Sequence, residues 1–374
     1  MALTSDIVNT LPTFVIAEAG VNHNGDVERA LTMVDAAAQT GADAIKFQTF
    51  IASELVTATA VKADYQRQTT DPAETQLQML QSLELGMDDF ARLMDRCAAR
   101  DIEFISTPFD PISLAGLTAL GVRRLKIASG DLTNAPLLVQ FARTGLPLIL
   151  STGMGTLAEV EGALAAIAWA FQHPDIASTP EDPAFREERQ GLQSNARLGQ
   201  EVTVLHCTTE YPAPFAEINL RAMDTLGQAF GCAVGYSDHT VGIEVAIAAV
   251  ARGATVIEKH FTLDRSLPGP DHAASITPDE FSAMTRSIRN VETALGSSTK
   301  TPGASEFRNA PIARKSLVAT AEIAAGERFS TANLGAKRPG KGLSPTRYWQ
   351  LLGTMAERSY LPGEMIRPGE LNDA

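Results

Sequence analysis

The stretch TVIEKHFTLD at residues 255–264 opens with β-branched residues and then sets an acid, a base and an imidazole side by side. β-Branched runs are typical of a buried strand, whereas Glu258, Lys259 and His260 are costly to bury unless each finds a partner or a ligand. Successive side chains of a strand point to opposite faces. The stretch therefore predicts a strand that ends in a site, with Glu258 and His260 facing that site and Lys259 pointing away.

Seven further apolar stretches precede this one, and helical patterns alternate with them. The strand-like ranges are 13–20, 43–49, 103–108, 124–129, 147–152, 202–207 and 232–238, and helical patterns cover 27–41, 87–100, 157–171, 242–253 and 278–296. Eight strand–helix units over about 280 residues are typical of an α/β protein with a (β/α)8 TIM barrel. A doubly wound sheet rarely reaches eight regular units, and no glycine-rich dinucleotide motif follows the first strand.

Two segments interrupt this alternation. Residues 50–86 form a long excursion after the second strand, and residues 172–198 separate the fifth unit from the sixth strand. The second segment is polar and contains proline, so we expect it to be an exposed insertion.

The pattern changes after the last helical stretch. Residues 297–311, SSTKTPGASEFRNAP, are typical of a linker. The chain beyond them has only short apolar runs and is rich in turn residues. GERFSTANL (326–334) and GEMIRPGEL (363–371) share a Gly-Glu pair and a leucine at the same spacing. The sequence thus predicts a barrel domain at 1–296, a linker at 297–311 and a small pseudo-symmetric β domain at 312–374.

The composition limits the partners of the chain. A formal net charge of -13 over 374 residues opposes binding to nucleic acid or to an anionic membrane. No apolar run reaches membrane length, and the first residues lack the basic start and apolar core of a signal peptide. The 3 cysteines are sparse and lack metal-type spacing, so we expect a reduced, cytoplasmic protein with unpaired thiols.

Polar side chains gather where the predicted strands end, which is where barrel enzymes place their catalytic groups. They are Glu18, Lys46, Gln48, Ser106, Thr107, Lys126, Ser129, Asp131, Ser151, Thr152, His206, Ser237, Asp238, His239, Glu258 and His260. A lone lysine at a strand end usually pairs with a carboxylate, and NHNG at 22–25 can be a simple turn. Their clustering nonetheless predicts an active site. In the sixth strand we expect His206 to face this site and Cys207 to point outward and pack.

Two chemistries fit the set. Lys46 and Lys126 can hold a small phosphorylated carboxylate, with hydroxyls from Thr107, Ser129, Ser151 and Ser237 around them. His239 and His260 follow neighbouring strands and can share one divalent cation. Two imidazoles leave coordination positions open, which suits Lewis-acid work more than a closed structural site.

Ten motifs, in order along nearly the whole chain, resemble the sialic acid synthase family. They are IAEAGVNHNGD (16–26), KFQTF (46–50), STPFD (106–110), KIASGD (126–131), LSTGM (150–154), LHCTTEYPAP (205–214), GYSDHTVGIE (235–244), IEKHFTLD (257–264), GPDHAAS (269–275) and KRPGKGLSP (337–345). The resemblance implies a TIM barrel followed by a C-terminal antifreeze-like (SAF) β-clip domain. It also implies condensation of phosphoenolpyruvate with an N-acetylated hexosamine and water, giving a nine-carbon 2-keto acid and phosphate.

The resemblance also implies roles for individual residues. Phosphoenolpyruvate would be bound by Lys46, Thr107, Lys126, Ser129, Ser151 and Ser237; the sugar and water sites would be lined by Glu18, Gln48, Tyr211, Glu258 and Asp271. His239 and His260 would bind Mn²⁺ or Mg²⁺. In relatives the SAF domain reaches the active site of the other subunit in a domain-swapped homodimer, where the residue matching Arg338 contacts the N-acetyl group.

The chain departs from the family pattern at two site positions. Asp131 stands where the family usually has glutamate, so its side chain is one methylene shorter, and Thr209 stands where asparagine is frequent.

The motifs leave the sugar open. The product implied is N,N'-diacetyllegionaminate from 2,4-diacetamido-2,4,6-trideoxymannose, or N-acetylneuraminate from N-acetylmannosamine, with pseudaminate as an alternative. A synthase acting on a phosphorylated aldose would need further basic residues, which are not found here. A Schiff-base pyruvate aldolase would need a catalytic lysine and no metal. A catalytically inactive sugar-binding relative is the non-enzyme alternative.

Overall fold

The computed structural model describes residues 12–71, 73–175 and 182–370, which divide into two compact units at residue 296. Three sequence-based expectations fall partly outside these ranges: the pattern of the first residues, the middle of the 172–198 insertion, and the second leucine of the internal repeat, Leu371. Within the described ranges, no helix combines the length and apolarity needed to cross a membrane. The boundaries 1–296, 297–311 and 312–374 stay a prediction.

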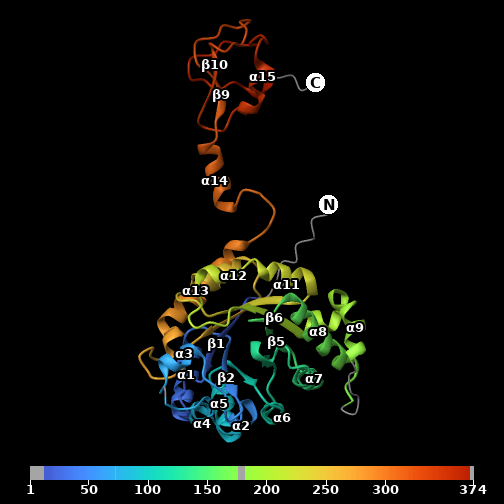
Figure 1. The fold of residues 1–374 in the computed structure, drawn as a ribbon. Coiled ribbons are helices and arrows are strands. Elements are labelled where there is room, and N and C mark those ends of the chain that lie inside the picture. The colour runs from blue at the N-terminus through green and yellow to red at the C-terminus, as the bar shows by residue number, and fades with distance from the viewer. Residues whose placement is uncertain (1–11, 72, 176–181, 371–374) are drawn as a thin grey trace. The chain divides into compact units, whose positions relative to one another are not determined.

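The first unit is a parallel barrel of eight strands, as predicted from the alternating pattern (Figure 1). The strands are β1 Phe14–Gly20, β2 Ala44–Thr49, β3 Glu103–Pro108, β4 Leu125–Ile127, β5 Leu148–Ser151, β6 Val202–Cys207, β7 Ala233–Asp238 and β8 Val256–His260. β1 pairs in parallel with both β2 and β8, so the first and last strands of the predicted series lie side by side.

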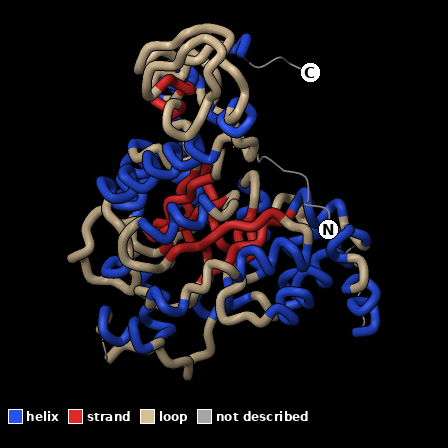
Figure 2. Tube along the Cα trace, turned by 90° about the horizontal axis from the view of Figure 1, so that it is seen from above, coloured by secondary structure: helices blue, strands red, loops and turns tan. Residues whose placement is uncertain are grey.

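Helices surround the strands, as Figure 2 shows from above. Those that alternate with the strands are α1 Val27–Gln39, α5 Met87–Ala99, α6 Pro111–Leu120, α7 Ala135–Arg143, α8 Leu157–Gln172, α11 Ala222–Phe230, α12 Glu244–Ala251 and α13 Pro278–Leu295. Their starts carry expected signals: Asp26 accepts backbone hydrogen bonds at the start of α1, and Thr156 with Glu159 forms a capping box on α8.

The barrel interior is layered, and this layering positions the site. The lower layer is apolar and consists of Ile16, Ala44, Ile105, Ile149, Leu205 and Val256. Two residues further along the same strands stand Glu18, Lys46, Thr107, Ser151, Cys207 and Glu258. Because the side-chain period of a strand is two, these polar residues form the next layer toward the carboxyl ends.

The two interruptions form small helical excursions. The first contains α2 Ala52–Leu55, α3 Asp64–Thr69 and α4 Gln76–Leu83, with an apolar cluster of its own. The second contains α9 Asp182–Arg189 and α10 Ala196–Glu201, and Phe185 packs edge-on against Trp169 of α8 at 6.3 Å. Leu192 and Leu198 of this excursion are also buried in the main hydrophobic core, while most of its described residues from 187 to 195 are exposed.

The second unit begins with α14 Ala304–Ala313, which starts in the predicted linker, extends past its end at residue 311 and has no buried residue. Beyond it lie β9 Ser316–Ala319 and β10 Leu334–Lys337, which pair antiparallel, and α15 Tyr348–Leu351. A separate apolar core includes Leu317, Phe329, Tyr360 and Ile366.

The Gly-Glu part of the predicted internal repeat is confirmed by matching contacts at its two positions. Glu327 Oε2 accepts a hydrogen bond from the backbone of Ala324, and Glu364 Oε2 accepts the equivalent bond from Leu361. Gly326 and Gly363 both have positive φ, at 83° and 87°, which glycine adopts without strain.

Candidate active site

The carboxyl end of the barrel brings two lysines and two glutamates into direct contact. Lys46 Nζ lies 2.6 Å from Glu18 Oε2 and 3.5 Å from Glu258 Oε2. Lys126 Nζ lies 3.6 Å from Glu258 Oε1. All four side chains are 6% exposed or less, and buried charges persist only with such partners. Four of the residues predicted for the active site therefore meet in one cluster.

The two glutamates of the cluster differ in their readiness to bind a proton. Burial raises the pKa of Glu18 to about 7, because it outweighs the attraction of Lys46. Burial also acts on Glu258, but Lys126, Lys46 and a hydrogen bond from Ser237 outweigh it and lower the pKa of Glu258 to about 2. Glu18 can therefore exchange a proton near neutral pH, while Glu258 stays ionised.

The two lysines differ as well. Burial works against the charged form of Lys46, but Glu18 and Glu258 outweigh it and raise the pKa of Lys46. For Lys126 burial prevails, and its pKa is lowered although Glu258 attracts the proton. Glu258 lies within reach of both lysines, so an anion that binds between them also meets this carboxylate.

Four of the predicted substrate-binding residues hydrogen-bond to the cluster. The pairs are Lys46 with Thr107 Oγ1 at 3.3 Å, Lys126 with Ser151 Oγ at 2.7 Å, Ser237 Oγ with Glu258 Oε1 at 2.8 Å, and Gln48 Nε2 with Glu18 Oε1 at 3.4 Å. The hydroxyls that hydrogen-bond to these charged groups in the free protein can instead donate to ligand oxygens when an anion binds, because each hydroxyl both donates and accepts.

Two buried imidazoles lie next to the cluster, at the ends of β7 and β8. The ring centroids of His239 and His260 are 5.4 Å apart. Burial lowers the pKa of His239 to about 4 and that of His260 well below its usual value, so both rings are neutral at pH 7. His239 Nδ1 lies 2.6 Å from the carbonyl oxygen of Thr208, which can only accept, so the lone pair is on Nε2.

The imidazoles fit an open metal site better than a closed one. Among the described residues, no group of three or more His, Cys, Asp or Glu side chains converges as in a structural metal site. A ligating histidine usually donates its other ring N–H to a carbonyl, as His239 does to Thr208. His260 Nδ1 is buried without a hydrogen-bond partner in the described part of the chain. The donor set therefore suits a cation that keeps positions for water or substrate.

Tyr211 and Asp271, both predicted for the sugar and water sites, lie beside the imidazoles. The ring of Tyr211 is 4.3 Å from that of His239 and 5.4 Å from that of His260. Asp271 Oδ2 is 4.0 Å from His260 Nδ1, and burial raises the pKa of Asp271 to about 6. Both side chains therefore lie at the part of the site that the two imidazoles occupy.

The sixth strand corrects one prediction: Cys207 faces the site, and His206 points away from it. Cys207 Sγ lies 3.3 Å from Ser129 Oγ, whereas His206 Nε2 lies 2.6 Å from the carbonyl oxygen of Ile218. Leu205, two residues before Cys207, belongs to the interior apolar layer. Both faces of a parallel strand in a barrel are buried, so the apolar pattern did not reveal which face was which.

Ser129 and Thr209 converge on the backbone of Gly153. The Gly153 N–H donates to Ser129 Oγ at 3.0 Å. A Cβ at position 153 would lie 2.2 Å from Thr209 Oγ1 and 2.8 Å from Ser129 Oγ, so a larger residue does not fit. Thr209 Oγ1 is buried with no hydrogen-bond partner among the described residues, which leaves this hydroxyl for a ligand.

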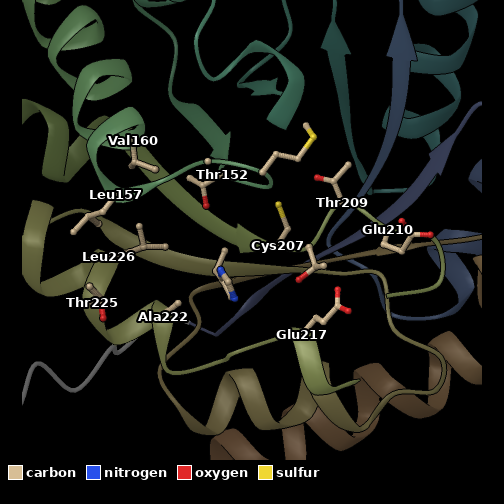
Figure 3. Close-up of a pocket in the computed structure, with 14 residues that line it drawn as sticks. Thr152, Leu157, Val160, Cys207, Thr209, Glu210, Glu217, Ala222, Thr225 and Leu226 are labelled. Atoms are coloured by element: carbon tan, nitrogen blue, oxygen red, sulfur yellow. The ribbon is translucent and has the colours of Figure 1, made fainter. Parts of the chain in front are cut away.

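A cavity of about 480 Å³ adjoins this corner of the site and is drawn in Figure 3. In the view, Cys207 lies between Thr152 and Thr209, with Glu210 and Glu217 at the rim. Its remaining lining comes from Met154, Gly155, Leu157, Val160, His206, Thr208, Ala222, Thr225 and Leu226. The cavity therefore lies between the end of β6 and the helices α8 and α11, and it meets the site at Cys207 and Thr209.

Two predicted residues lie apart from the cluster. Asp131 follows β4, accepts a hydrogen bond from Asn134 Nδ2 at 3.0 Å, and has its pKa raised by burial. Its carboxylate forms no ion pair with Lys46 or Lys126 in the described structure. Arg338 is exposed and belongs to the second unit, so it is not among the side chains that the barrel itself assembles.

A hydrogen-bonded clamp beneath Asp271 was missed by the sequence interpretation. Asn22 Nδ2 donates to the carbonyl oxygen of Phe261 and to Ser275 Oγ, both at 2.9 Å. Ser275 in turn donates to the carbonyl oxygen of Asp271 at 2.7 Å. The NHNG motif is therefore a turn, as its positive φ values at Asn24 and Gly25 require, and also an anchor for the segment that carries Asp271.

Comparison with known proteins agrees with this geometry. The NeuB family model matches residues 33–300, and the SAF domain model matches residues 314–372. The chain is 45% identical to an N,N'-diacetyllegionaminic acid synthase of Campylobacter jejuni, covering 95% of this chain and 99% of that one. It is 43% identical to the synthase of the same name from Legionella pneumophila, covering 96% and 94%.

A solved structure shares the fold. The N-acetylneuraminic acid synthetase of Leptospira borgpetersenii, in complex with citrate, is 34% identical with a TM-score of 0.65, covering 80% of this chain and 90% of that one. The match to the family model covers most of the barrel, and the relatives align over nearly the full length. The chain therefore belongs to the NeuB family and carries a C-terminal SAF domain.

Proposed function

We propose that this chain condenses phosphoenolpyruvate with 2,4-diacetamido-2,4,6-trideoxymannose and water to give N,N'-diacetyllegionaminate and phosphate. The observation that carries the proposal is its similarity, over nearly the whole chain, to two N,N'-diacetyllegionaminic acid synthases. The buried cluster of Lys46, Lys126, Glu18 and Glu258 supports it, since this cluster offers both anion-binding and proton-exchanging groups.

The two lysines form the anion site of this proposal. Lys46 and Lys126 would neutralise the phosphate and carboxylate of phosphoenolpyruvate, with hydroxyls from Thr107, Ser129, Ser151 and Ser237 completing the oxygens' hydrogen bonds. Support comes from the Lys126–Ser151 and Lys46–Thr107 contacts, which already place donors side by side at this end. Preorganised donors in a buried site contribute several kcal/mol of charge stabilisation.

The two glutamates would have different roles, one in proton transfer and the other in charge stabilisation. Glu18, whose pKa of about 7 matches neutral operation, would take the proton from the attacking water or return it to the new alcohol. Glu258, ionised at neutral pH, would face the positive charge that develops at C2 of the substrate. Asp271, with a pKa of about 6, is a second proton acceptor at the sugar end.

The reaction balances without an oxidant. C3 of the enol phosphate forms a bond to the aldehyde carbon of the open-chain sugar, and the aldehyde oxygen gains a proton. Water adds to C2, and the C2–O bond to phosphate then breaks, releasing inorganic phosphate. Gln48, Tyr211, Thr209 and Asp131 would hold the sugar chain and its acetamido groups during these steps.

His239 and His260 would hold a divalent cation, Mn²⁺ or Mg²⁺. When bound, the cation would polarise the aldehyde oxygen as a Lewis acid. The chain's own contribution is to keep both imidazoles neutral and to fix the His239 ring through Thr208. Tyr211 packs on both rings and shields them from bulk water.

We also propose a domain-swapped homodimer in which Arg338 binds the N-acetyl group in the other subunit's site. The exposed position of Arg338 in the second unit leaves its guanidinium available for such a contact. The protein is proposed to act in the cytoplasm, on small substrates and without nucleic acid.

The experiment for this function follows phosphate release from phosphoenolpyruvate with the diacetamido sugar, with N-acetylmannosamine and without sugar. We expect sugar-dependent release, fastest with the diacetamido sugar and abolished by a chelator. Faster release with N-acetylmannosamine would assign the chain to N-acetylneuraminate synthesis instead. A covalent adduct trapped by borohydride with pyruvate would indicate Schiff-base chemistry and overturn the proposal.

A further inference from the structure

One ion pair lies directly behind the two imidazoles, on the outer face of the barrel wall. Lys259 Nζ lies 2.7 Å from Asp238 Oδ2 and 2.8 Å from the carbonyl oxygen of Thr240. The side chains of Lys259 and Asp238 are 1% and 0% exposed. Lys259 points away from the site, as the strand period predicts, so neither charge of this pair can touch the substrates.

The pair joins the two residues of β7 and β8 that alternate with the site residues. Asp238 is opposite Lys259 in the strand register, and Ser237 is opposite Glu258. On the inner face Ser237 Oγ donates to Glu258 Oε1 at 2.8 Å. The two strand ends are thus joined on both faces, next to His239, which follows β7, and His260, which is the last residue of β8.

Asp238 also shapes the turn that carries His239. Its Oδ1 accepts from the backbone N–H of Thr240 at 3.0 Å and from the Thr240 hydroxyl at 2.8 Å. His239 sits between these two residues, and its own carbonyl oxygen accepts from the backbone of Ala213 at 2.8 Å. The backbone of His239 is therefore fixed by Asp238 on one side and by Ala213 on the other.

Stability alone does not account for such a pair. Burying two charges costs about as much as their attraction returns, and apolar replacements of both partners are frequently neutral or stabilising. The pair does fix the relative position of β8, β7 and the turn after β7, since Lys259 donates both to a carboxylate of β7 and to a carbonyl of that turn.

We infer that Lys259 and Asp238 are positioning residues, whose ion pair behind the barrel wall sets the spacing and orientation of His239 and His260. The inference rests on the proposed metal role of the two imidazoles. Loss of the pair lets the ends of β7 and β8 shift relative to one another, and a two-imidazole site depends directly on that distance. Removal of residues that orient metal ligands typically weakens metal binding about 10–100-fold.

The test compares Lys259→Met, Asp238→Asn and the double variant with the Arg289→Met control. Arg289 Nη2 pairs with Asp43 Oδ2 at 2.8 Å, and this control removes an ion pair of similar length away from the imidazoles. Mn²⁺ affinity is measured by calorimetry, and folding by circular dichroism and thermal unfolding. In the double variant no buried charge is left unpaired, so we expect its melting temperature to recover relative to Lys259→Met.

A positioning role predicts that Mn²⁺ affinity does not recover with the melting temperature. The double variant should bind Mn²⁺ about 10–100-fold more weakly than wild type, whereas Arg289→Met should bind it normally. Wild-type Mn²⁺ affinity in the folded double variant would overturn the inference.

A readout without metal separates this inference from the proposed metal site. If the wild-type protein binds no Mn²⁺, the metal proposal fails, and the ring ¹⁵N resonances of His239 and His260 decide the inference. These resonances report the hydrogen bond from His239 to Thr208. We expect them to move in the double variant and to stay in place in Arg289→Met; unchanged resonances in both would contradict a positioning role.

Discussion

The ammonium of Lys46 lies 2.6 Å from the carboxylate of Glu18, with both side chains almost fully buried at the carboxyl end of the barrel. Glu18 therefore neutralises the positive charge of Lys46, which in the proposed function would bind the anionic phosphoenolpyruvate. Because burial raises the pKa of Glu18 to about 7, a proton can release Lys46 at little cost. We therefore expect Glu18 to take up a proton when an anionic substrate binds at Lys46.

Phosphoenolpyruvate affinity should depend on pH through Glu18. Above pH 7 the ionised carboxylate holds Lys46 and repels the incoming anion; below pH 7 Glu18 is protonated and both effects disappear. We expect the affinity for phosphoenolpyruvate, measured by calorimetry, to rise as pH falls from 8.5 to 6. Glu18→Gln should bind phosphoenolpyruvate at every pH in that range with the affinity that the wild type reaches at low pH. A pH dependence retained in Glu18→Gln would refute this role.

Loss of His239 should remove most turnover and leave the fold intact. His239→Ala deletes one of the two imidazoles and its bond to Thr208, but the ring lies at the barrel mouth and not in the apolar layers. A metal contact contributes several kcal/mol, so we expect turnover to fall about 100-fold or more. The check is steady-state kinetics with and without added Mn²⁺, beside a thermal unfolding curve. Full activity of the variant in metal-free buffer would contradict the assignment.

Loosening the clamp beneath Asp271 should affect the sugar more than phosphoenolpyruvate. Asn22→Ala removes the donors to Phe261 and Ser275, which hold the Asp271 segment, but touches neither lysine. Each buried acceptor left unpaired costs about 1–3 kcal/mol. We expect a raised KM for the sugar and a nearly unchanged KM for phosphoenolpyruvate. Equal increases in both values would show that Asn22 acts on the whole barrel.

Acid should destabilise the barrel through His23. This side chain is fully buried in the NHNG turn, and burial lowers its pKa to about 4 from the usual 6.5. Between these values the unfolded chain binds a proton that the folded chain does not, so stability falls as pH drops from 6.5 to 4. The loss is on the order of 3 kcal/mol for this residue.

Denaturant unfolding at several pH values measures this loss. His23→Asn keeps an acceptor near the Gly25 N–H but does not titrate, so its stability should change less over the same interval. The prediction is wrong if the two proteins lose the same stability between pH 6.5 and pH 4.

Much of the barrel could be predicted, because each strand has a local apolar run that is visible in the sequence. All eight strands lie within the predicted ranges, and the ionisable residues near the ends of β1, β2, β4 and β8 do meet. The face of β6 could not be predicted, because Val204 packs in the outer core and Leu205 in the inner layer, and both are equally apolar. The prediction that Lys259 points away from the site is confirmed. Its pairing with Asp238 could not be predicted, because it depends on the register between β7 and β8, which the sequence alone does not reveal.

The central claim concerns the sugar, and a competition assay tests it most directly. Phosphoenolpyruvate is supplied in limiting amount to the enzyme with equal concentrations of 2,4-diacetamido-2,4,6-trideoxymannose, N-acetylmannosamine and the pseudaminate precursor. Mass spectrometry and NMR then identify the nine-carbon acid formed. We predict N,N'-diacetyllegionaminate as the main product, with one phosphate released per molecule. A main product of N-acetylneuraminate or pseudaminate, or no nine-carbon acid at all, would contradict the account.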